Sequence, residues 1–180
     1  MAKEQAMTLG VHEVFVAAGS NVQPFVALRT ALDALAKIYG PLKVSPAYRN
    51  APAGFVGEDF INLAIGFDTN EPAVLVRERL QQVEALCGRP PDAPKWGPRR
   101  MDLDILLYGE LISDEPGLVL PRPDLVRRAY MLKPMTDIAP DLRHPTLGKT
   151  MRELWEAFDR DAHPLVPVEL PSTSAGATSR

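Results

Sequence analysis

Cysteine is almost absent from this sequence, with Cys87 the only one among 180 residues. A single cysteine excludes an internal disulfide, a cysteine-based zinc cluster and a CxxC redox pair. No apolar run approaches the ~20 residues that cross a membrane, and the first ten residues lack the apolar core of a secretory signal. Cations are not in excess either, since 20 Lys and Arg stand against 23 Asp and Glu, which disfavours non-specific binding to nucleic acid. These absences predict a cytoplasmic globular protein with neither nucleic-acid nor membrane partners.

Proline, in contrast, is abundant, and many of the 18 prolines cluster in 90–98 and 116–123. Such clusters between periodic segments predict stiff, shaped loops, which carry functional sites more often than scaffold. At the two ends, low-complexity sequence predicts a flexible leader over 1–10 and a flexible tail over 164–180. The remaining residues, 11–163, show no internal repeat and no linker, which predicts a single domain.

Hydrophobic periodicity predicts the order of the elements. We expect strands over 11–18, 42–50, 60–69 and 101–108, with one helix from Phe25 to Ile38 and a second that starts after Asn70 and stops at Gly88. Short helices near 124–129 and 134–138 and an amphipathic helix through 151–158 should follow. The order β-α-β-β-α-β fits the ferredoxin-like motif, an α+β fold with an antiparallel sheet, helices on one face and extra C-terminal helices.

Two aspartates interrupt an otherwise apolar strand at Asp102-Leu103-Asp104. Residues i and i+2 of a strand share a face and lie about 6.6 Å apart. Two neighbouring carboxylates repel each other, so a positive charge should lie between them. Mg²⁺ is one such charge, since it takes one or two carboxylates together with substrate phosphates. A pair of structural salt bridges to Arg99 and Arg100 is the alternative.

Basic residues cluster around these aspartates although the chain is acidic overall. They lie in the loop 88–100 and in the segment 121–130, and they are Arg89, Lys95, Arg99, Arg100, Arg122, Arg127 and Arg128. Such a local excess predicts an anionic ligand, and arginine suits phosphate oxygens. No P-loop motif occurs, so a bound nucleotide would be held by side chains and metal. A solvated connection with surface charges is the alternative for the loop.

An aromatic and an amide lie close together at Phe60 and Asn62. An amide reads the edge of a flat heterocycle while an aromatic ring stacks on its face. Taken alone, the pattern favours a satisfied strand-edge amide at Asn62 and a core residue at Phe60. The histidines, His12, His144 and His163, lack ligand spacing and are interpreted as surface or structural residues.

Several motifs occur in one order along the chain: VFVAAGSN at 14–21, FIN at 60–62, KWGPRRMDLDILLYG at 95–109 and RAYMLKP at 128–134. Together they closely resemble the 6-hydroxymethyl-7,8-dihydropterin pyrophosphokinase family of folate biosynthesis, from about residue 12 to 158. The resemblance implies transfer of pyrophosphate from ATP to the pterin hydroxymethyl group, with release of AMP. It implies small-molecule partners, ATP and a dihydropterin, and we expect a monomer.

The resemblance also implies roles for individual residues. Asp102 and Asp104 would hold two Mg²⁺ ions, and Arg89 and Arg99 would close over the triphosphate, these four forming the catalytic set. The implied ATP contacts are Gln81, Glu84, Arg89, Trp96, Arg99, Ile105, Arg122 and Arg128. The implied pterin contacts are Asn50, Ala51, Ala53, Phe60, Asn62 and Tyr130, with Phe60 and Tyr130 as the aromatic clamp and Asn62 at the edge.

The sequence departs from the family pattern at three places. Arg122 stands where the family usually has histidine, Pro91 stands where some members have a second loop arginine, and Ala51 and Ala53 stand where bulkier residues or proline are common. These departures leave a non-catalytic or altered-specificity pterin- or nucleotide-binding paralogue as the alternative. An RNA-binding ferredoxin-like module is disfavoured, because the paired aromatic and basic strand signature is missing.

Overall fold

A six-stranded antiparallel sheet forms the middle layer of the computed structural model, which describes residues 10–52, 56–88 and 101–171. In chain order the elements are β1 (His12–Ser20), α2 (Pro24–Tyr39), β2 (Lys43–Val44), β3 (Ala47–Asn50), β4 (Phe60–Thr69), α3 (Ala73–Leu86), β5 (Asp102–Tyr108), β6 (Ser113–Glu115), β7 (Leu118–Leu120), the 3₁₀ helix η1 (Pro123–Val126), α4 (Ala129–Ile138), α5 (Met151–Glu156) and β8 (Val166–Val168). Within those ranges no helix combines the length and apolar character needed to cross a membrane.

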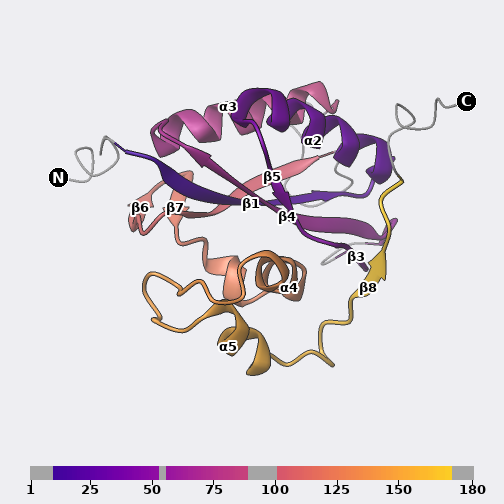
Figure 1. Cartoon of the computed structure of the whole chain (residues 1–180). Coiled ribbons are helices and arrows are strands. Elements are labelled where there is room, and N and C mark those ends of the chain that lie inside the picture. Colours follow the sequence, from indigo (N-terminus) through magenta and orange to yellow (C-terminus); the bar gives the residue numbers. More distant parts are fainter. Residues whose placement is uncertain (1–9, 53–55, 89–100, 172–180) are drawn as a thin grey trace, which may run out of the picture.

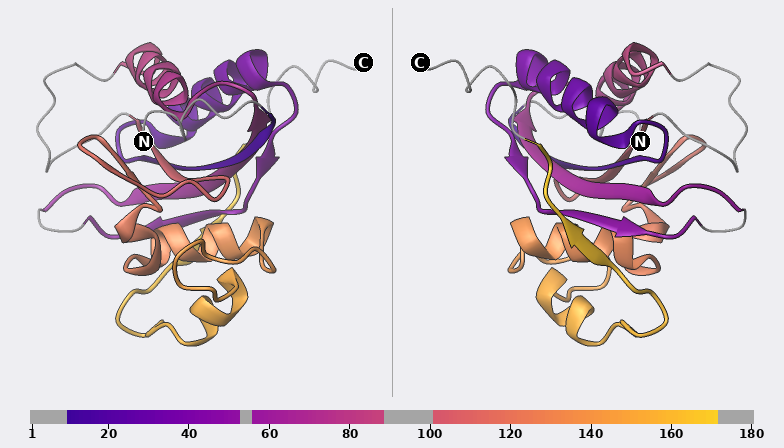
Figure 2. Two further views of the ribbon diagram at one scale, coloured as in Figure 1. Left: turned by 90° about the vertical axis from the view of Figure 1, so that its left-hand side faces the viewer. Right: turned by 90° about the vertical axis from the view of Figure 1, so that its right-hand side faces the viewer.

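The sheet has the strand order β5-β1-β4-β3-β8, with β2 also paired to β4. Helices α2 and α3 cover one face, whereas α4 lies against the other and α5 packs on α4 (Figure 1). The same three layers are seen from both sides in Figure 2. The elements β1, α2, β3, β4, α3 and β5 therefore form a βαββαβ unit with its two helices on one face, which confirms the predicted ferredoxin-like α+β fold.

Each face of the sheet buries its own apolar cluster. Val14, Val16 and Ala18 of β1 point toward α2 and α3, whereas Phe15 and Ala17 point toward α4 and α5. This alternation follows from the two-residue period of a strand. The pairing of β1 with β5 shifts register between Phe15 and Val16. Side chains of β5 on the two sides of this irregularity therefore do not follow one continuous alternation. The aspartate-bearing end of β5 lies before that shift.

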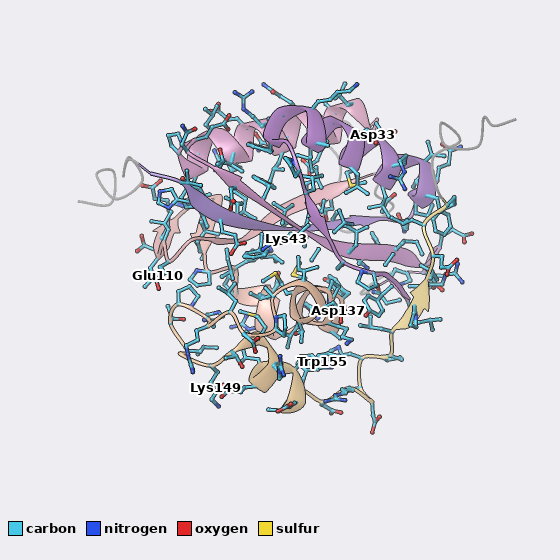
Figure 3. All side chains as sticks on the ribbon, in the orientation of Figure 1. Asp33, Lys43, Glu110, Asp137, Lys149 and Trp155 are labelled. Atoms are coloured by element: carbon cyan, nitrogen blue, oxygen red, sulfur yellow. The ribbon has the colours of Figure 1, made fainter. Side chains whose placement is uncertain are left out.

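Helix α4 is attached to the sheet by polar contacts as well as apolar ones. The Tyr48 hydroxyl of β3 donates a hydrogen bond to the Asp137 carboxylate of α4, and Lys133 Nζ lies 2.9 Å from the other oxygen of that carboxylate. Figure 3 shows Asp137 and Trp155 on the same side of the sheet, on α4 and α5 respectively. These contacts fix the position of α4 beneath the strands that carry the candidate site.

The structure differs from the sequence prediction in four places. The strand expected over 42–50 is divided into β2 and β3 at Ser45-Pro46, because Pro46 has no N–H to donate. Helix α4 starts at Ala129 instead of near 134, with Pro134 inside it. The β6–β7 hairpin was not predicted. Part of the expected flexible tail forms β8, which pairs with β3.

Candidate active site

One row of paired residues crosses four strands on the sheet face that α4 covers. Asp102 of β5 is opposite Gly19 of β1, Gly19 is opposite Asn62 of β4, and Asn62 is opposite Tyr48 of β3. Since neighbouring strands lie about 4.8 Å apart, the backbones at Asp102 and Asn62 are separated by about 10 Å. The candidate metal ligand and the candidate pterin reader are thus brought to one place, although forty residues separate them in the chain.

The two aspartates face away from the larger core. Leu103 and Ile105 are 5% and 7% exposed and pack in the cluster under α2 and α3. Asp102 and Asp104 therefore point to the opposite face, as the alternation predicts, and both are half-buried. They retain access to solvent and to a ligand while being held on a rigid strand.

Gly19 provides the space that Asn62 occupies. A Cβ atom placed on Gly19 would lie 3.4 Å from Asn62 Cγ and closer still to Asn62 Oδ1. The Asn62 side chain is 7% exposed, and its Nδ2 donates a hydrogen bond to Asn50 Oδ1 of the neighbouring strand. Phe60 is opposite Asn50 at the start of β4. Three of the predicted pterin residues thus form one patch at the ends of β3 and β4.

Tyr130 approaches the same face from α4. Burial raises the pKa of the Tyr130 hydroxyl above its ordinary value, so this group stays protonated at neutral pH. The charged groups that act on it next, in order of strength, are those of Arg128, Asp124, Asp104 and Arg122. The predicted second aromatic of the clamp is therefore close enough to sense Asp104, a candidate metal ligand, and the basic residues around it.

A cleft of about 390 Å³ opens beside the aspartates. Helix α3 contributes Gln81 and Glu84 to its lining, and β5 contributes Asp102, Asp104 and Ile105. The opposite wall is the end of the β6–β7 hairpin, from Gly117 to Leu120, followed by Arg122 and Pro123. Among the predicted ATP contacts that the structure describes, only Arg128, the residue that caps the start of α4, is not part of this lining.

Arg122 is held loosely between two carboxylates. Its Nη1 lies 3.6 Å from Asp104 Oδ1, and its Nη2 lies 3.7 Å from Asp124 Oδ2. Charge-assisted hydrogen bonds measure about 2.7–2.9 Å, so neither contact is a close one. Its Nε is buried and finds no hydrogen-bond partner within the described ranges. This guanidinium therefore has capacity for a further acceptor in the cleft.

Glu84 is fixed against the strand that carries the aspartates. Its Oε2 accepts a hydrogen bond of 2.8 Å from the Leu103 backbone N–H, and the residue is only 9% exposed. Among the strands that the structure describes, β5 is at the edge of the sheet and pairs with β1 alone, so its outward N–H groups need other partners. Glu84 provides one for the residue between Asp102 and Asp104.

The arrangement of acids suits a cation that brings its own further ligands. Within the described ranges, no three His, Cys, Asp or Glu side chains gather closely enough to form an all-protein metal site. Mg²⁺ is commonly bound by one or two carboxylates, with water and substrate phosphates completing its shell. Asp102 and Asp104, beside a cleft with a basic wall, fit that pattern.

Four predicted residues lie outside the described residues, namely Ala53, Arg89, Trp96 and Arg99, as do Pro91 and Arg100. Ala51 is exposed on the loop after β3. Conversely, the sequence analysis missed Gly19, Arg77 and the hairpin wall of the cleft. The turn signal Pro116-Gly117 between short apolar runs indicates the hairpin. Arg77 could have been found because it precedes Gln81 by four residues on a predicted helix.

Comparison with known proteins gives a consistent family. Residues 15–140 match the model for 7,8-dihydro-6-hydroxymethylpterin-pyrophosphokinase (HPPK). A protein of Pseudomonas aeruginosa named 2-amino-4-hydroxy-6-hydroxymethyldihydropteridine pyrophosphokinase is 39% identical over 151 residues, which cover 82% of this chain and 92% of that protein. A protein of the same name from Methylorubrum extorquens is 37% identical over 150 residues, covering 81% of this chain and 92% of the relative.

Solved structures support the fold. The HPPK-DHPS triple mutant of Plasmodium falciparum with SDX-DHP superposes with a TM-score of 0.65 at 15% identity, covering 82% of this chain. This chain spans 44% of that longer solved chain, and that likeness establishes the fold alone. By the family model and the similarity to its bacterial relatives, the chain belongs to the 7,8-dihydro-6-hydroxymethylpterin-pyrophosphokinase family.

Proposed function

We propose that this protein transfers pyrophosphate from MgATP to the hydroxymethyl group of 6-hydroxymethyl-7,8-dihydropterin and releases AMP, a step of folate biosynthesis. Membership of the family supports this activity. The observation that carries it is the row on the sheet, in which Asp102 and Asn62 flank Gly19 and share one face. This row brings a candidate phosphate-and-metal site next to a candidate heterocycle site.

The pterin would lie over the ends of β3 and β4. Asn62 has the donor and acceptor that a pterin edge requires, and its hydrogen bond to Asn50 fixes which way the amide faces. Phe60 and Tyr130 would stack on the two faces of the ring, with Ala51 and Ala53 in the adjoining loop. In this position the hydroxymethyl group would point along the row toward Asp102.

The nucleotide would occupy the cleft between α3, β5 and the hairpin. Gln81, Glu84 and Ile105 line it, and Arg122 supplies positive charge at one wall. Arg128, at the start of α4, would contribute a further phosphate contact. Arg89, Trp96 and Arg99 belong to the proline-rich loop outside the described residues, and we expect Arg89 and Arg99 to contact the triphosphate.

In the proposed reaction, the pterin hydroxyl oxygen bonds to the β-phosphorus of ATP and the bond from that phosphorus to the α–β bridging oxygen breaks. AMP leaves with the bridging oxygen, and the hydroxyl proton passes to water. Bound at Asp102 and Asp104, two Mg²⁺ ions would neutralise phosphate charge and polarise the attacked phosphorus. The side chains of the protein orient the two substrates, which is the main catalytic requirement of phosphoryl transfer.

The test is to incubate the purified protein with MgATP, with and without 6-hydroxymethyl-7,8-dihydropterin, and to separate the nucleotide products. AMP that forms only with the pterin is the expected result. Binding of both substrates without pterin-dependent AMP would contradict the proposal and indicate a non-catalytic binding protein. The cytoplasmic location and the monomeric state stay predictions, and light scattering during gel filtration measures the latter.

A further inference from the structure

Arg77 extends the cleft-facing side of α3 by one helical turn. It precedes Gln81 by four residues and Glu84 by seven, and residues at these intervals share one side of a helix. All three side chains line the cleft beside the aspartates. Arg77 is thus a cation on the same surface as two predicted ATP contacts. Neither the sequence motifs nor the family resemblance pointed to it.

The guanidinium of Arg77 lies directly against the backbone of the hairpin. A Cβ atom placed on Gly117 would be 2.5 Å from Arg77 Nη1 and 3.6 Å from Cζ. The side chain therefore occupies the volume that any larger residue at position 117 would fill. Gly117 also has φ +81°, a conformation that favours glycine. Because residue 117 is glycine, the hairpin turn leaves room for the Arg77 side chain at the wall of the cleft.

Arg77 has an unmet hydrogen-bond donor at this position. Its Nε is buried and has no partner among the residues that the structure describes, and the same is true of Arg122 Nε on the adjoining wall. Arginine stays charged at every accessible pH and cannot remove the unmet donor by losing a proton. Both arginines also line the cleft, from α3 and from the segment after the hairpin, and two cations facing one cleft favour an anionic ligand.

We propose that Arg77 binds a phosphate group of the nucleotide polyphosphate in this cleft, opposite Arg122. The planar guanidinium of arginine matches phosphate oxygens, which accept hydrogen bonds from its N–H groups. This proposal rests on the proposed function in that it takes ATP as the occupant of the cleft. Arg77 then acts as a substrate-binding residue that helix α3 holds in place before the ligand arrives.

The test compares Arg77→Met with Arg79→Met, which removes the same charge from the same helix. Arg79 is a suitable control because its Nε pairs with Glu71 Oε1 at 2.7 Å and it does not line the cleft. Calorimetry with the magnesium complex of α,β-methylene-ATP should show an affinity loss of about 10- to 100-fold for Arg77→Met and less than about 2-fold for Arg79→Met. Equal affinities of the two variants would overturn the proposal.

Inorganic tripolyphosphate, used with Mg²⁺ as a competitor against the analogue, identifies the recognised group. Arg77→Met should lower the affinities for tripolyphosphate and for the analogue by similar factors. A loss confined to the analogue would place the contact on the nucleoside and overturn the phosphate assignment. Gly117→Ala provides a second approach, because its methyl group displaces the Arg77 guanidinium. The loss of analogue affinity that it causes should not add to the loss caused by Arg77→Met.

Two further measurements separate this proposal from the proposed function and from misfolding. Without ligand, Arg77→Met should unfold no earlier than Arg79→Met, because Arg79 pairs with Glu71 at 2.7 Å whereas the buried Arg77 Nε has no partner among the described residues. If the wild-type protein binds the analogue but forms no AMP, the proposed function fails while the binding comparison still decides the role of Arg77. If the wild-type protein does not bind the analogue, both proposals are overturned.

Discussion

The hydrogen bond from the Leu103 N–H to Glu84 should contribute measurably to stability. Glu84→Ala leaves that edge-strand N–H buried without its acceptor, and the loss of a hydrogen bond to a charged group costs about 2 kcal/mol. For a domain of this size, each kcal/mol lowers the unfolding midpoint by about 2–4 °C, so we expect a decrease of about 4–8 °C. Glu84→Gln retains an acceptor without the charge and should lose about half as much.

Thermal unfolding followed by circular dichroism measures this effect, with Glu78→Ala as the control. Glu78 is exposed on the same helix, so its removal should change stability by less than about 0.5 kcal/mol. Equal midpoints for Glu84→Ala and Glu78→Ala would refute the reasoning. Kinetics of Glu84→Gln then separate two roles: a lower kcat indicates that Glu84 positions the aspartate strand, whereas a higher KM for ATP alone indicates only a nucleotide contact.

Three further predictions concern the sheet face and the cleft. Asp102→Ala or Asp104→Ala should abolish pterin-dependent AMP formation while the protein stays folded, because both aspartates are half-buried and lie outside the apolar clusters; wild-type turnover would contradict this. Gly19→Ala should displace the Asn62 amide and weaken pterin binding about 3- to 10-fold, with unchanged affinity for the ATP analogue by calorimetry as the control. Arg122→His should lose ATP affinity as the pH rises from 6 to 8, since histidine becomes neutral near its ordinary pKa of about 6.5, whereas the wild-type affinity should vary less; equal losses in both proteins would refute it.

The sequence was sufficient for those features that depend on local periodicity. The alternation in β5 places Leu103 in the core and Asp102 on the other face, and the structure confirms both placements. The order of strands and helices likewise led to the ferredoxin-like fold, because few topologies accommodate that order. These predictions required only the directions of successive side chains along one element.

Features that depend on how elements meet were not predictable in the same way. The role of Gly19 follows from the register between β1 and β4, which places it opposite Asn62; a shift of one residue would have moved it to the other face. The cleft wall depends on the β6–β7 hairpin folding back toward α3. The position of Arg77 likewise depends on Gly117, which lies against its guanidinium although it follows Arg77 by forty positions.

The position of each strand in the sheet suits the task of its residues. The central strands β1 and β4 are each hydrogen-bonded on both sides, and they carry Gly19 and Asn62, the candidate reader of the heterocycle edge. Strand β5 is at the edge, so α3 and the hairpin can approach it and form a cleft where a central strand would leave no room. Its outward Leu103 N–H is then satisfied by Glu84 from α3. The same hydrogen bond that stabilises the edge strand thereby holds α3, one wall of the cleft, against the strand that carries the aspartates. The sheet in this way places the candidate nucleotide cleft next to the candidate pterin patch.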